Sequence, residues 1–535
     1  MRADTDYRVI EVDPDVSVLF LAGNHRAFLV ERELGDRLHQ GFDRLTAEES
    51  AEWARLAEQG LVGEQNRDVL RRSTFEDGAD LAVNVNLTNI CNLACTYCFA
   101  DGGDYGRIKE AMGHTSVNDI FAFIEANLTP SRSVRLEMFG GEPLANYPTM
   151  LEICERSEAF AAEHGVRFVY RISTNLTLLP KGVLELFAKH RFIVSVSIDG
   201  GREVQDANRP ALGGQGSYDR VMNAVRKVRA ASDDITLVAR MTVAQREPSL
   251  IDNMRQLYDL DIFDYFQIYP GVFPAEDAGE TVVPVERKKV FVELKVRPDA
   301  DEAAAAETRS SCATPHAPEG TTYVNFFLQP GMTEQFRDFL HEYPSLFRPD
   351  NRFKGVLEYE RQVQMITDGL LALSFCSGGR TYFTHSPDRS ISPCHRLVGE
   401  PSFDVGTGGE GLTTTPEDWR LPVDGHPVCG QCWARYLCGG GCKQENFVAS
   451  GDINVLNDES CRYQLLLAEE VLAMMARSSA EYRDRDRARF ADMFVSCGRP
   501  VMPSGRPEPG LATGAGTNHF RPLAAVDHSE VRGLR

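Results

Sequence analysis

Two periodicities of apolar and polar residues alternate along residues 81–271. Six short apolar runs resemble buried strands, and amphipathic segments of helical period lie between them. The runs are LAVNVNLT, VRLEMFGG, RFVYRISTN, FIVSVSIDG, ITLVARMTV and YFQIYPG, and the segments include VNDIFAFIEANL, TMLEICERSEAFAAEHG, GVLELFAKH, YDRVMNAVRKVRAA and SLIDNMRQLYDL. Strands that alternate with helices imply right-handed βαβ crossovers and a parallel sheet. The pattern therefore predicts an α/β fold, with a partial (β/α)6 TIM-like barrel.

Other patterns flank this region and divide the chain. Residues 1–75 contain VSVLFLAG and then amphipathic helical segments, which predicts a short strand pair followed by helices in a small winged module. Residues 81–275 form the predicted barrel, and residues 276–365 form an acidic, Ala-rich bridge with a helical insertion around EQFRDFLHEYPSLF. A cysteine-rich domain is expected over residues 366–475. Residues 498–535 are rich in Gly, Pro and Arg, which predicts a disordered tail.

Composition restricts the function and the compartment. The 535 residues include 57 basic and 78 acidic side chains, a formal net charge of -21 that opposes binding to phosphate backbones. No run approaches the roughly 20 apolar residues of a membrane helix, and the N-terminal segment MRADTDYRVIEVDPD lacks the features of a signal peptide. We expect a cytoplasmic protein without nucleic-acid or membrane partners. In that compartment the clustered cysteines indicate metal sites rather than disulfides.

The first cysteine group follows the first predicted strand. The segment CNLACTYC places Cys91, Cys95 and Cys98 at spacings of four and three, so one loop can wrap them around one face of an iron-sulfur cluster. Three thiolates leave one iron of a 4Fe-4S cluster open to bind and activate a substrate. Ligand-binding groups gather at the carboxyl ends of strands in a parallel barrel, which is where this loop lies. A structural zinc site is the alternative, although no nearby fourth Cys or His is apparent.

The CxxxCxxC loop resembles that of the radical S-adenosylmethionine (SAM) superfamily, with Tyr97 in the family's usual aromatic position. The resemblance implies that the three cysteines are the catalytic ligands and that the open iron chelates the amino and carboxylate groups of SAM. Gly140, Gly141 and Glu142 in MFGGEPL resemble the family's GGE motif, which contacts the SAM amino group. Glycines permit close backbone approach, and the carboxylate is expected to pair with the ammonium.

Polar residues that follow later strands complete the expected SAM site. Ser173 and Asn175 in ISTN, and Ser197 in VSIDG, supply neutral groups suited to ribose hydroxyls and the SAM carboxylate. Arg209 suits that carboxylate bidentately. The structural alternatives are that Ser173 caps a strand end and that Arg209 is a surface partner of Asp206.

The second cysteine group has the spacing C-x17-C, a gap, then C-x2-C-x5-C-x3-C-x18-C. This spacing resembles the SPASM domain, the auxiliary-cluster extension of radical SAM enzymes that modify peptides and proteins. The resemblance assigns Cys376, Cys394 and Cys442 to auxiliary cluster I, and Cys429, Cys432, Cys438 and Cys461 to auxiliary cluster II. SPASM domains usually carry Gly where this chain has Arg389, which puts the turn geometry in doubt.

The remaining cysteines are not assigned as ligands. Cys312 is either the fourth ligand of auxiliary cluster I or a loop cysteine without a functional role. Cys154 is expected to be buried in an amphipathic helix, and Cys497 lies in the expected tail. The run from Cys429 to Cys442, taken by itself, also fits a zinc knuckle.

Longer segments resemble the thioether-forming branch, which includes the SCIFF-peptide maturases and the quinohemoprotein amine dehydrogenase maturase. They are CNLACTYCFADGGDYG, FGGEPLANY, ALGGQGSYDR, SPCHRLVG and CWARYLCGGGC. The resemblance spans residues 81–475 except the insertion near 275–365. It implies three 4Fe-4S clusters, SAM, a precursor peptide or protein as substrate, and an electron donor such as flavodoxin or ferredoxin.

The implied reaction begins with reductive cleavage of SAM to methionine and a 5'-deoxyadenosyl radical, which abstracts hydrogen from a substrate carbon. A cysteine sulfur then captures the carbon radical. Auxiliary cluster I, with three protein thiolates, would bind the substrate thiolate and accept the released electron, and auxiliary cluster II would pass it onward.

Other functions stay open. An anaerobic sulfatase maturase shares the SPASM domain but oxidises Cys or Ser to formylglycine, usually with full protein ligation of cluster I. A non-catalytic iron-sulfur or zinc protein, acting as redox sensor or scaffold, is a third reading. The N-terminal module is either a docking element for the barrel or similar to the recognition element that binds leader peptides.

Overall fold

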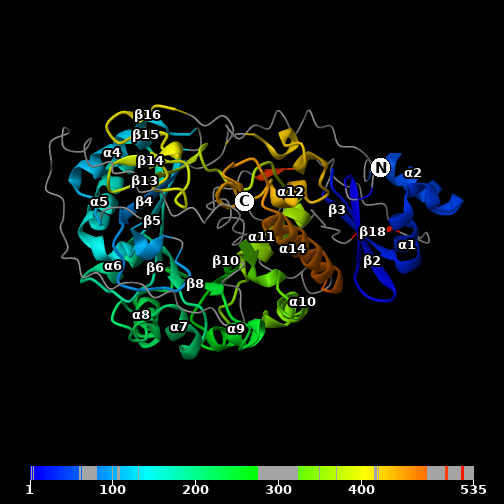
Figure 1. Cartoon of the computed structure of the whole chain (residues 1–535), viewed down its shortest axis with the longest axis horizontal. Coiled ribbons are helices and arrows are strands. Elements are labelled where there is room, and N and C mark those ends of the chain that lie inside the picture. The colour runs from blue at the N-terminus through cyan, green and yellow to red at the C-terminus, as the bar shows by residue number, and fades with distance from the viewer. Residues whose placement is uncertain are drawn as a thin grey trace.

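The computed structural model describes most of the chain between residues 5 and 478. The described ranges are 5–23, 25–58, 81–98, 100–104, 109–129, 132–274, 323–348, 350–368, 370–414 and 421–478, with residues 1, 3, 62 and 419 and the strands 501–503 and 520–522. Figure 1 shows the barrel region, the cysteine-rich region and an N-terminal sheet as neighbouring parts of one molecule. None of the helices in these ranges is both long and apolar enough to cross a bilayer.

Six parallel strands form the centre of the fold, in the order in which they occur along the chain. They are β4 (Leu81–Thr88), β5 (Ser133–Gly140), β6 (Arg167–Thr174), β7 (Ile193–Ser197), β8 (Thr236–Val243) and β9 (Tyr265–Pro270). Five of them lie within the apolar runs, and β5 begins one residue before its run. The predicted α/β fold with a parallel barrel sheet is confirmed.

Helices connect these strands and cover the outer face of the sheet (Figure 1). They are α4 (His114–Ala126), α5 (Tyr147–His164), α6 (Val183–Lys189), α7 (Arg202–Asn208), α8 (Tyr218–Ala231) and α9 (Leu250–Tyr258). In β4, Val83, Val85 and Leu87 join the apolar core, whereas the alternate residues Asn84 and Asn86 are buried on the other face. The alternation gives the barrel an apolar outside and a polar inside.

The cysteine-rich region continues the barrel sheet. β13 (Tyr382–His385) pairs in parallel with β4, and antiparallel strands β14 (Ser390–Ser392), β15 (Gly406–Thr407) and β16 (Gly411–Leu412) extend the sheet to ten strands. The sequence predicted a second domain in this region but did not indicate that its strands join the barrel sheet. These strands have only two to four residues, too few to show a period.

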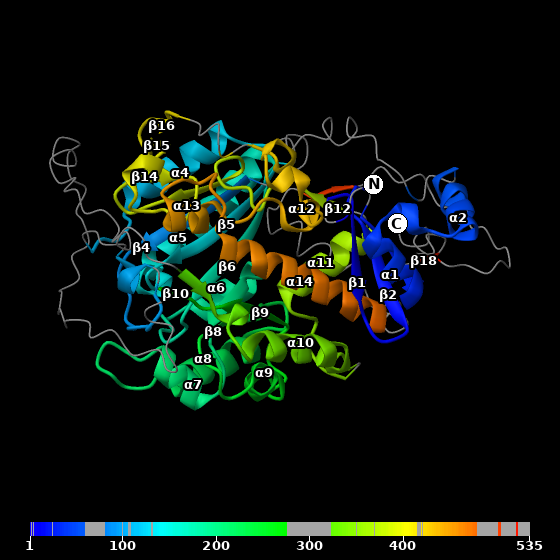
Figure 2. The same ribbon diagram turned by 45° about the vertical axis from the view of Figure 1, so that its right-hand side comes forward.

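The remaining helices join the barrel to the two ends of the chain. They are α10 (Met332–Glu342), α11 (Leu357–Asp368), α12 (Arg435–Cys438), α13 (Lys443–Ser450) and α14 (Asp458–Arg477). α10 lies in the helical insertion that the sequence predicted. Figure 2 shows α14 running from the barrel side toward the N-terminal sheet, and it packs against α10, α11 and β1.

The N-terminal sheet is a three-stranded meander with two buried faces. It comprises β1 (Tyr7–Glu11), β2 (Val16–Leu21) and β3 (Arg26–Glu31), followed by α1 (Arg32–Gln40) and α2 (Ala47–Glu58). One face joins the main core, where the rings of Phe20 and Trp433 lie 5.9 Å apart, and α1 covers the other face with Leu34 and Leu38. The sequence predicted strands followed by helices but indicated a strand pair rather than three strands.

Short strand pairs connect distant segments. β10 (Val272–Pro274) pairs with β11 (Tyr323–Asn325), β12 (Leu370–Ala372) with β17 (Val501–Pro503), and β18 (Phe520–Pro522) with β3. Thus residues 498–535, predicted as a disordered tail, contain two paired strands, while the rest of that segment lies outside the described residues. Both strands are held by main-chain pairing, which does not require an alternating apolar sequence. A sequence pattern therefore does not reveal them.

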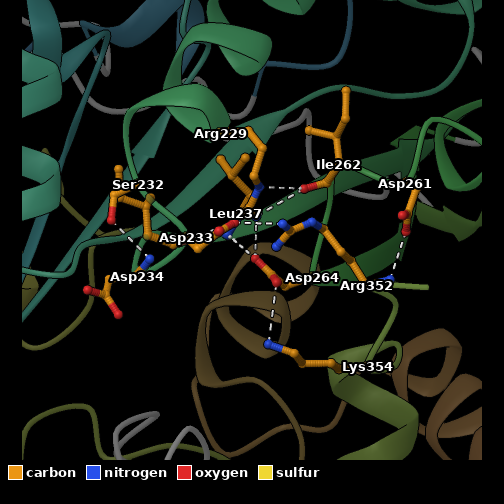
Figure 3. A network of polar contacts seen from close by, with 11 residues as sticks. Arg229, Ser232, Asp233, Asp234, Leu237, Asp261, Ile262, Asp264, Arg352 and Lys354 are labelled. Carbon is orange, nitrogen blue, oxygen red and sulfur yellow. Dashed lines mark hydrogen bonds and ion pairs between the residues drawn. The ribbon is translucent and has the colours of Figure 1, made fainter. Parts of the chain in front are cut away.

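The end of the barrel opposite the strand carboxyl ends is held by a polar network around Asp264 (Figure 3). The Asp264 carboxylate accepts hydrogen bonds from Arg229 Nη2 at 2.5 Å, Leu237 N at 2.9 Å and Lys354 Nζ at 3.3 Å. Arg352 forms an ion pair with Asp233 at 2.6 Å. The network fastens the segment before α11 to the start of β8 and β9.

Candidate active site at the carboxyl end of the barrel strands

The loop that carries the first three cysteines leaves the carboxyl end of β4 and is tied to the segment after α7. Ala94 N donates to Pro210 O at 2.8 Å, and Thr96 N donates to Asn208 O at 3.0 Å. An isolated bridge between Leu93 and Ala211 adds to this pairing. The loop is therefore held by main-chain contacts on both sides of Cys95.

The three thiols lie near one another and are short of compensating cations. Burial raises the pKa of the Cys95 thiol to about 11, an effect that Cys98 and Asp199 reinforce and Arg209 opposes. The pKa of Cys91 is also raised by burial, and further by Glu142, Cys95 and Cys98. Thiolates at these positions need a neighbouring positive charge, which the irons of a cluster supply when bound. The soft, clustered donor set fits an iron-sulfur cluster.

A single zinc ion stays the alternative prediction for these thiols. Within the described ranges, no three His, Cys, Asp or Glu side chains are gathered so that they could hold one metal ion. Single zinc ions take four ligands at about 2.0–2.3 Å.

The paired glycines at the end of β5 pack directly on the cysteine loop. A Cβ at Gly140, where φ is +130°, would lie 2.2 Å from Thr88 O, and one at Gly141 would lie 2.4 Å from Ile90 O. Gly141 N donates to Thr88 O at 2.7 Å. Only glycine permits this approach. The motif therefore sets the distance between the end of β5 and the start of the loop.

Glu142 connects the ends of two strands through its side chain. Its buried carboxylate accepts hydrogen bonds from Leu144 N at 3.0 Å, Thr174 Oγ1 at 2.6 Å and Asn175 N at 2.8 Å. Burial raises the pKa of this carboxyl to about 7, and the three hydrogen bonds act in the opposite direction. Pairing of Glu142 with the SAM ammonium stays a prediction, because the contacts in the structure are internal.

Asn175 contacts the cysteine loop through its side-chain amide. Its Nδ2 donates to Asn92 Oδ1 at 2.9 Å and lies 3.8 Å from Cys91 Sγ. Thr177 N donates back to Asn175 Oδ1 at 3.0 Å. This side chain thus orients a loop residue and a thiol. Its predicted role toward SAM is not tested by these contacts.

The other predicted SAM contacts lie on adjacent strands. Ser173 on β6 pairs in register with Ser195, and Ser197 at the end of β7 pairs with Arg240. Ser173 and Ser197 are half-buried on the same face of the sheet. Their place at neighbouring strand ends is compatible with the expected ribose and carboxylate contacts, which remain predictions.

Asp199, which the sequence analysis did not select, is the centre of the polar contacts around Tyr97 and Arg209. Its fully buried carboxylate accepts hydrogen bonds from Arg209 Nη2 at 2.9 Å, from Thr242 N at 2.9 Å and from the Tyr97 hydroxyl. The Arg209 guanidinium also lies over the Tyr97 ring, 5.2 Å from its centroid. The available signal was an acid directly after a strand, in the SIDG segment, with Arg209 ten residues later.

The structure separates Arg209 from its alternative partner. Asp206 instead accepts a hydrogen bond from Tyr218 N at 2.8 Å. Arg209 is buried, and its Nε has no hydrogen-bond partner among the described residues. A buried cation with one unused donor beside Cys95 suits an anionic ligand, as predicted for the SAM carboxylate.

The barrel interior between this site and the cysteine-rich region is lined by polar side chains. Glu137 pairs with Arg135 at 2.6 Å and with Arg171 at 3.7 Å. The Tyr382 hydroxyl and His395 Nδ1 lie 2.8 Å apart. None of these residues was selected from the sequence, because their shared position depends on the register of three strands. Together they form a set of polar side chains that contact one another.

The cysteines of the second group fall into two sets by their electrostatic contacts. Cys394 interacts with both Cys376 and Cys442, and burial raises the pKa of its thiol to about 12. Arg396 lies beside this set, with its N 3.4 Å from Cys394 Sγ and its Nη1 3.7 Å from Cys442 Sγ. This is the set that the SPASM resemblance assigns to auxiliary cluster I, and its role as a ligand set stays a prediction.

The second set contains the other four thiols. Cys461 interacts with Cys429, Cys432 and Cys438, and burial raises the pKa of Cys429 to about 12. Cys154 is fully buried in α5, as the sequence indicated. Cys312 and Cys497 lie outside the described residues. The grouping of these four is the one assigned to auxiliary cluster II, again as a prediction.

The turn before Cys394 accommodates Arg389 in place of glycine. Arg389 has φ +67°, in the left-handed region that favours glycine. Its guanidinium binds Asp119 of α4 bidentately, with Nε to Oδ2 at 2.6 Å and Nη2 to Oδ1 at 3.1 Å. The side chain thus connects the turn to α4 of the barrel. This contact gives Arg389 a structural role at a position where the SPASM pattern has glycine.

The family comparison concerns the barrel and its cysteine loop. Residues 85–247 match the family model described as Radical SAM superfamily. The chain therefore carries a radical SAM domain, and the recognition made from the sequence is confirmed.

Two curated relatives share part of that domain. The chain is 25% identical over 202 residues to a cysteine-type anaerobic sulfatase-maturating enzyme of Clostridium novyi, covering 36% of this chain and 51% of the relative. It is 26% identical over 150 residues to a serine-type anaerobic sulfatase-maturating enzyme of Klebsiella aerogenes, covering 28% and 36%. The chain thus spans about half or less of the length of these relatives.

A solved structure extends the comparison to most of the fold. It is described as native anSMEcpe with bound AdoMet and Cp18Cys peptide, and superposes with a TM-score of 0.54 at 16% sequence identity. The match covers 73% of this chain and 96% of that chain. At this identity the likeness concerns the fold, which includes the cysteine-rich region as well as the barrel.

Proposed function

We propose that this protein is a radical SAM maturase that modifies a ribosomally made peptide or protein, most specifically by joining a cysteine sulfur to a carbon atom. The observation that carries the proposal is the division of ten thiols into neighbouring sets of three, three and four. Cys91, Cys95 and Cys98 hold the SAM-binding 4Fe-4S cluster in this scheme. The remaining sets hold two auxiliary clusters.

When bound and reduced, the first cluster would supply an electron for the cleavage of SAM, and SAM would supply the group that takes a hydrogen atom from a substrate carbon. The chain's own residues position this chemistry. Asp199 holds Tyr97 and Arg209 against the loop, and Asn175 orients its amide toward Cys91. Arg209 Nε is available to the SAM carboxylate.

The thioether proposal depends on the three-thiol set. Cys376, Cys394 and Cys442 would hold auxiliary cluster I, which would supply a binding position for a substrate thiolate. The carbon-sulfur bond formed from a thiolate and a carbon radical releases one electron, and the auxiliary clusters would supply its acceptor. Hydrogen leaves the carbon as 5'-deoxyadenosine, so the atoms and the electrons balance.

Formylglycine formation is the second candidate, favoured by the relatives and by the solved fold. It requires a two-electron oxidation of one Cys or Ser side chain and no bond between two residues. If Cys312 supplied a fourth thiolate, auxiliary cluster I would be closed to a substrate thiolate. The two candidates therefore differ in the ligand set of one cluster.

The first test is anaerobic reconstitution followed by an iron count and a dithionite-driven SAM cleavage assay. We expect about 12 irons per chain, four for each 4Fe-4S cluster, and formation of 5'-deoxyadenosine. Alanine at Cys91, Cys95 and Cys98 should remove about four irons and all cleavage. Bound zinc, or full iron loading without 5'-deoxyadenosine, would overturn the proposal in favour of a non-catalytic protein.

The second test addresses auxiliary cluster I. The Cys312→Ala variant should leave the iron count and the electron paramagnetic resonance spectrum of the reduced protein unchanged, as should the matched control Cys497→Ala. Cys394→Ala should lose about four irons while the SAM cluster stays. A changed spectrum in Cys312→Ala alone would indicate full protein ligation and favour formylglycine chemistry.

A further inference from the structure

Arg396 contacts the three-thiol set, which consists of Cys376, Cys394 and Cys442. Its main-chain N donates to Cys394 Sγ at 3.4 Å, and its Nη1 donates to Cys442 Sγ at 3.7 Å. One residue thus offers a main-chain donor and a charged side-chain donor to two sulfurs that lie far apart in the sequence.

A turn after β14 places both donors. Leu397 N donates to Cys394 O at 3.0 Å, so residues 394–397 form a turn that brings Arg396 N back to the sulfur of Cys394. The side chain reaches the start of α13, where Cys442 is the N-cap residue. The main-chain path around the two cysteines therefore determines both contacts.

A carboxylate holds the guanidinium in this position. Glu445, in the first turn of α13, accepts from the same Nη1 with its Oε1 at 2.9 Å. Its other oxygen, Oε2, accepts from Ser460 Oγ at 2.5 Å. Ser460 directly precedes Cys461, which belongs to the set of four thiols. Arg396 and Glu445 therefore connect the two sets.

The ion pair between Arg396 and Glu445 is partly shielded from water. The Arg396 side chain is 29% exposed and that of Glu445 is 25% exposed. Less water around a charge means weaker screening, so this guanidinium has a larger effect on the neighbouring sulfurs than an exposed one would have. Arginine is always protonated in proteins, so its charge is permanent.

Contacts of this kind change how readily an iron-sulfur cluster is reduced. Reduction adds negative charge to a cluster and its thiolates, and a nearby cation or N–H donor stabilises the more negative state. Arg396 offers both to this set. Glu445 acts in the opposite direction, because its carboxylate contacts the same nitrogen as Cys442 Sγ and so brings a negative charge close to that sulfur.

We infer that Arg396 raises the reduction potential of the cluster held by the three-thiol set, and that Glu445 holds the guanidinium in place. The presence of that cluster rests on the proposed function. A higher potential favours acceptance of the electron that thioether formation releases. Arg396 acts through the ligand sulfurs and is therefore a positioning residue, whose role requires no contact with the substrate.

The test is a redox titration of the reconstituted full chain, followed by electron paramagnetic resonance without SAM or substrate. The signal of auxiliary cluster I is the one that Cys394→Ala removes. For Arg396→Gln we expect about a tenfold fall in the equilibrium constant for reduction of this cluster, a potential lower by ~59 mV for a one-electron couple. Arg396→Lys keeps a positive charge and should show a smaller fall.

Glu445→Gln separates the effect of charge from that of packing. Glutamine keeps an oxygen that can accept from Arg396, and it removes the negative charge beside the sulfurs. We therefore expect the potential to rise, opposite to the change in Arg396→Gln. Looser packing around the thiols gives no reason for the sign to reverse, so shifts in the same direction would overturn the inference.

Arg462→Gln is the matched control. Arg462 directly follows Cys461 on α14, its side chain is 64% exposed, and it pairs with Glu459 at 2.8 Å. Because water screens an exposed pair, the potential of auxiliary cluster I should stay that of the parent. A shift in Arg462→Gln as large as that in Arg396→Gln would overturn the assigned contact.

An iron count on each preparation distinguishes this inference from the proposed function. If Cys394→Ala loses neither iron nor a signal, the three thiols are not a ligand set, and the proposed function fails together with the inference. If the signal is present and Arg396→Gln keeps both the iron and the parent potential, the inference alone fails. If Arg396→Gln loses iron, the Arg396→Lys and Glu445→Gln shifts decide the question.

Discussion

The ion pair between Asp199 and Arg209 offers the sharpest test of how the SAM site is assembled. In Asp199→Asn, one amide oxygen and one NH2 replace two carboxylate oxygens that now accept from Arg209, Thr242 N and Tyr97. With its NH2 toward Arg209 and Thr242 N, the amide faces two donors. Turned the other way, its NH2 faces the donor Asn208 Nδ2, which lies 3.3 Å from Oδ2 of Asp199. In both cases the buried guanidinium loses its counterion. Breaking a buried pair from one side costs about 3–5 kcal/mol. Because the amide keeps one oxygen that can accept a hydrogen bond, we expect a loss of stability near the lower end of this range, about 3 kcal/mol.

The assay is thermal unfolding under anaerobic conditions, combined with an iron count. A cost near 3 kcal/mol corresponds to a fall of about 6–12 °C in the midpoint for a domain of this size. Because Tyr97 lies between two cluster cysteines, we also expect reduced iron at the first cluster and slower formation of 5'-deoxyadenosine. The matched control is Asp219→Asn, which breaks an exposed Arg202 pair and should leave the midpoint unchanged.

A double variant separates charge from packing. Asp199→Asn combined with Arg209→Gln removes the stranded cation, so its destabilisation should be smaller than the sum of the two single changes. If the unfolding midpoint of Asp199→Asn lay within 1 °C of the parent, the loss would be only on the order of 0.3 kcal/mol. That result would refute the role of Asp199 as the buried counterion of Arg209. Strict additivity in the double variant would refute the assigned ion pair.

Three further predictions concern separate sites. Asn175→Ala removes the amide beside Cys91 Sγ and should slow SAM cleavage several-fold without loss of iron, measured as the initial rate of 5'-deoxyadenosine formation; an unchanged rate would remove this contact from the mechanism. Arg389→Ala keeps the left-handed backbone but leaves Asp119 unpaired, so it should destabilise by about 1–3 kcal/mol, and more than Arg389→Gly, in thermal unfolding. Burial lowers the pKa of His385 to about 3, so only the unfolded state binds this proton as the pH falls from about 6.5 toward 3, and the folded state loses stability. His385→Leu should lessen this loss, measured as the free energy of unfolding against pH. Equal pH profiles for the variant and the parent would contradict the prediction.

The barrel could be predicted from the sequence because its signal is repeated and local. β4 occupies the predicted run LAVNVNLT from end to end, and β8 begins one residue later than its run. Buried parallel strands are long enough here, at five to eight residues, for their apolar content to stand out from the helices. The strands β13 to β16 carry no such signal.

The centre of the site could be predicted only in part, because its contacts join residues far apart in the sequence. Asp199 binds Tyr97, Arg209 and Thr242, which belong to three different segments. Motif spacing located two of these four residues but gave Arg209 an alternative partner that the structure does not use. The partner of Arg389 could not be inferred at all, since Asp119 precedes it by 270 residues.

The parallel pairing of β13 with β4 also decides where this protein can be cut. A fragment that stopped after β9 would leave the main-chain groups of Ala82 to Val85 without their partners from Tyr382 to His385. Such a bare edge is a template for self-association, so the isolated barrel should aggregate rather than persist as a minimal SAM-cleaving unit. Exchange of cysteine-rich regions between related enzymes therefore has to carry β13 with its own barrel, and the functional border lies beyond this strand.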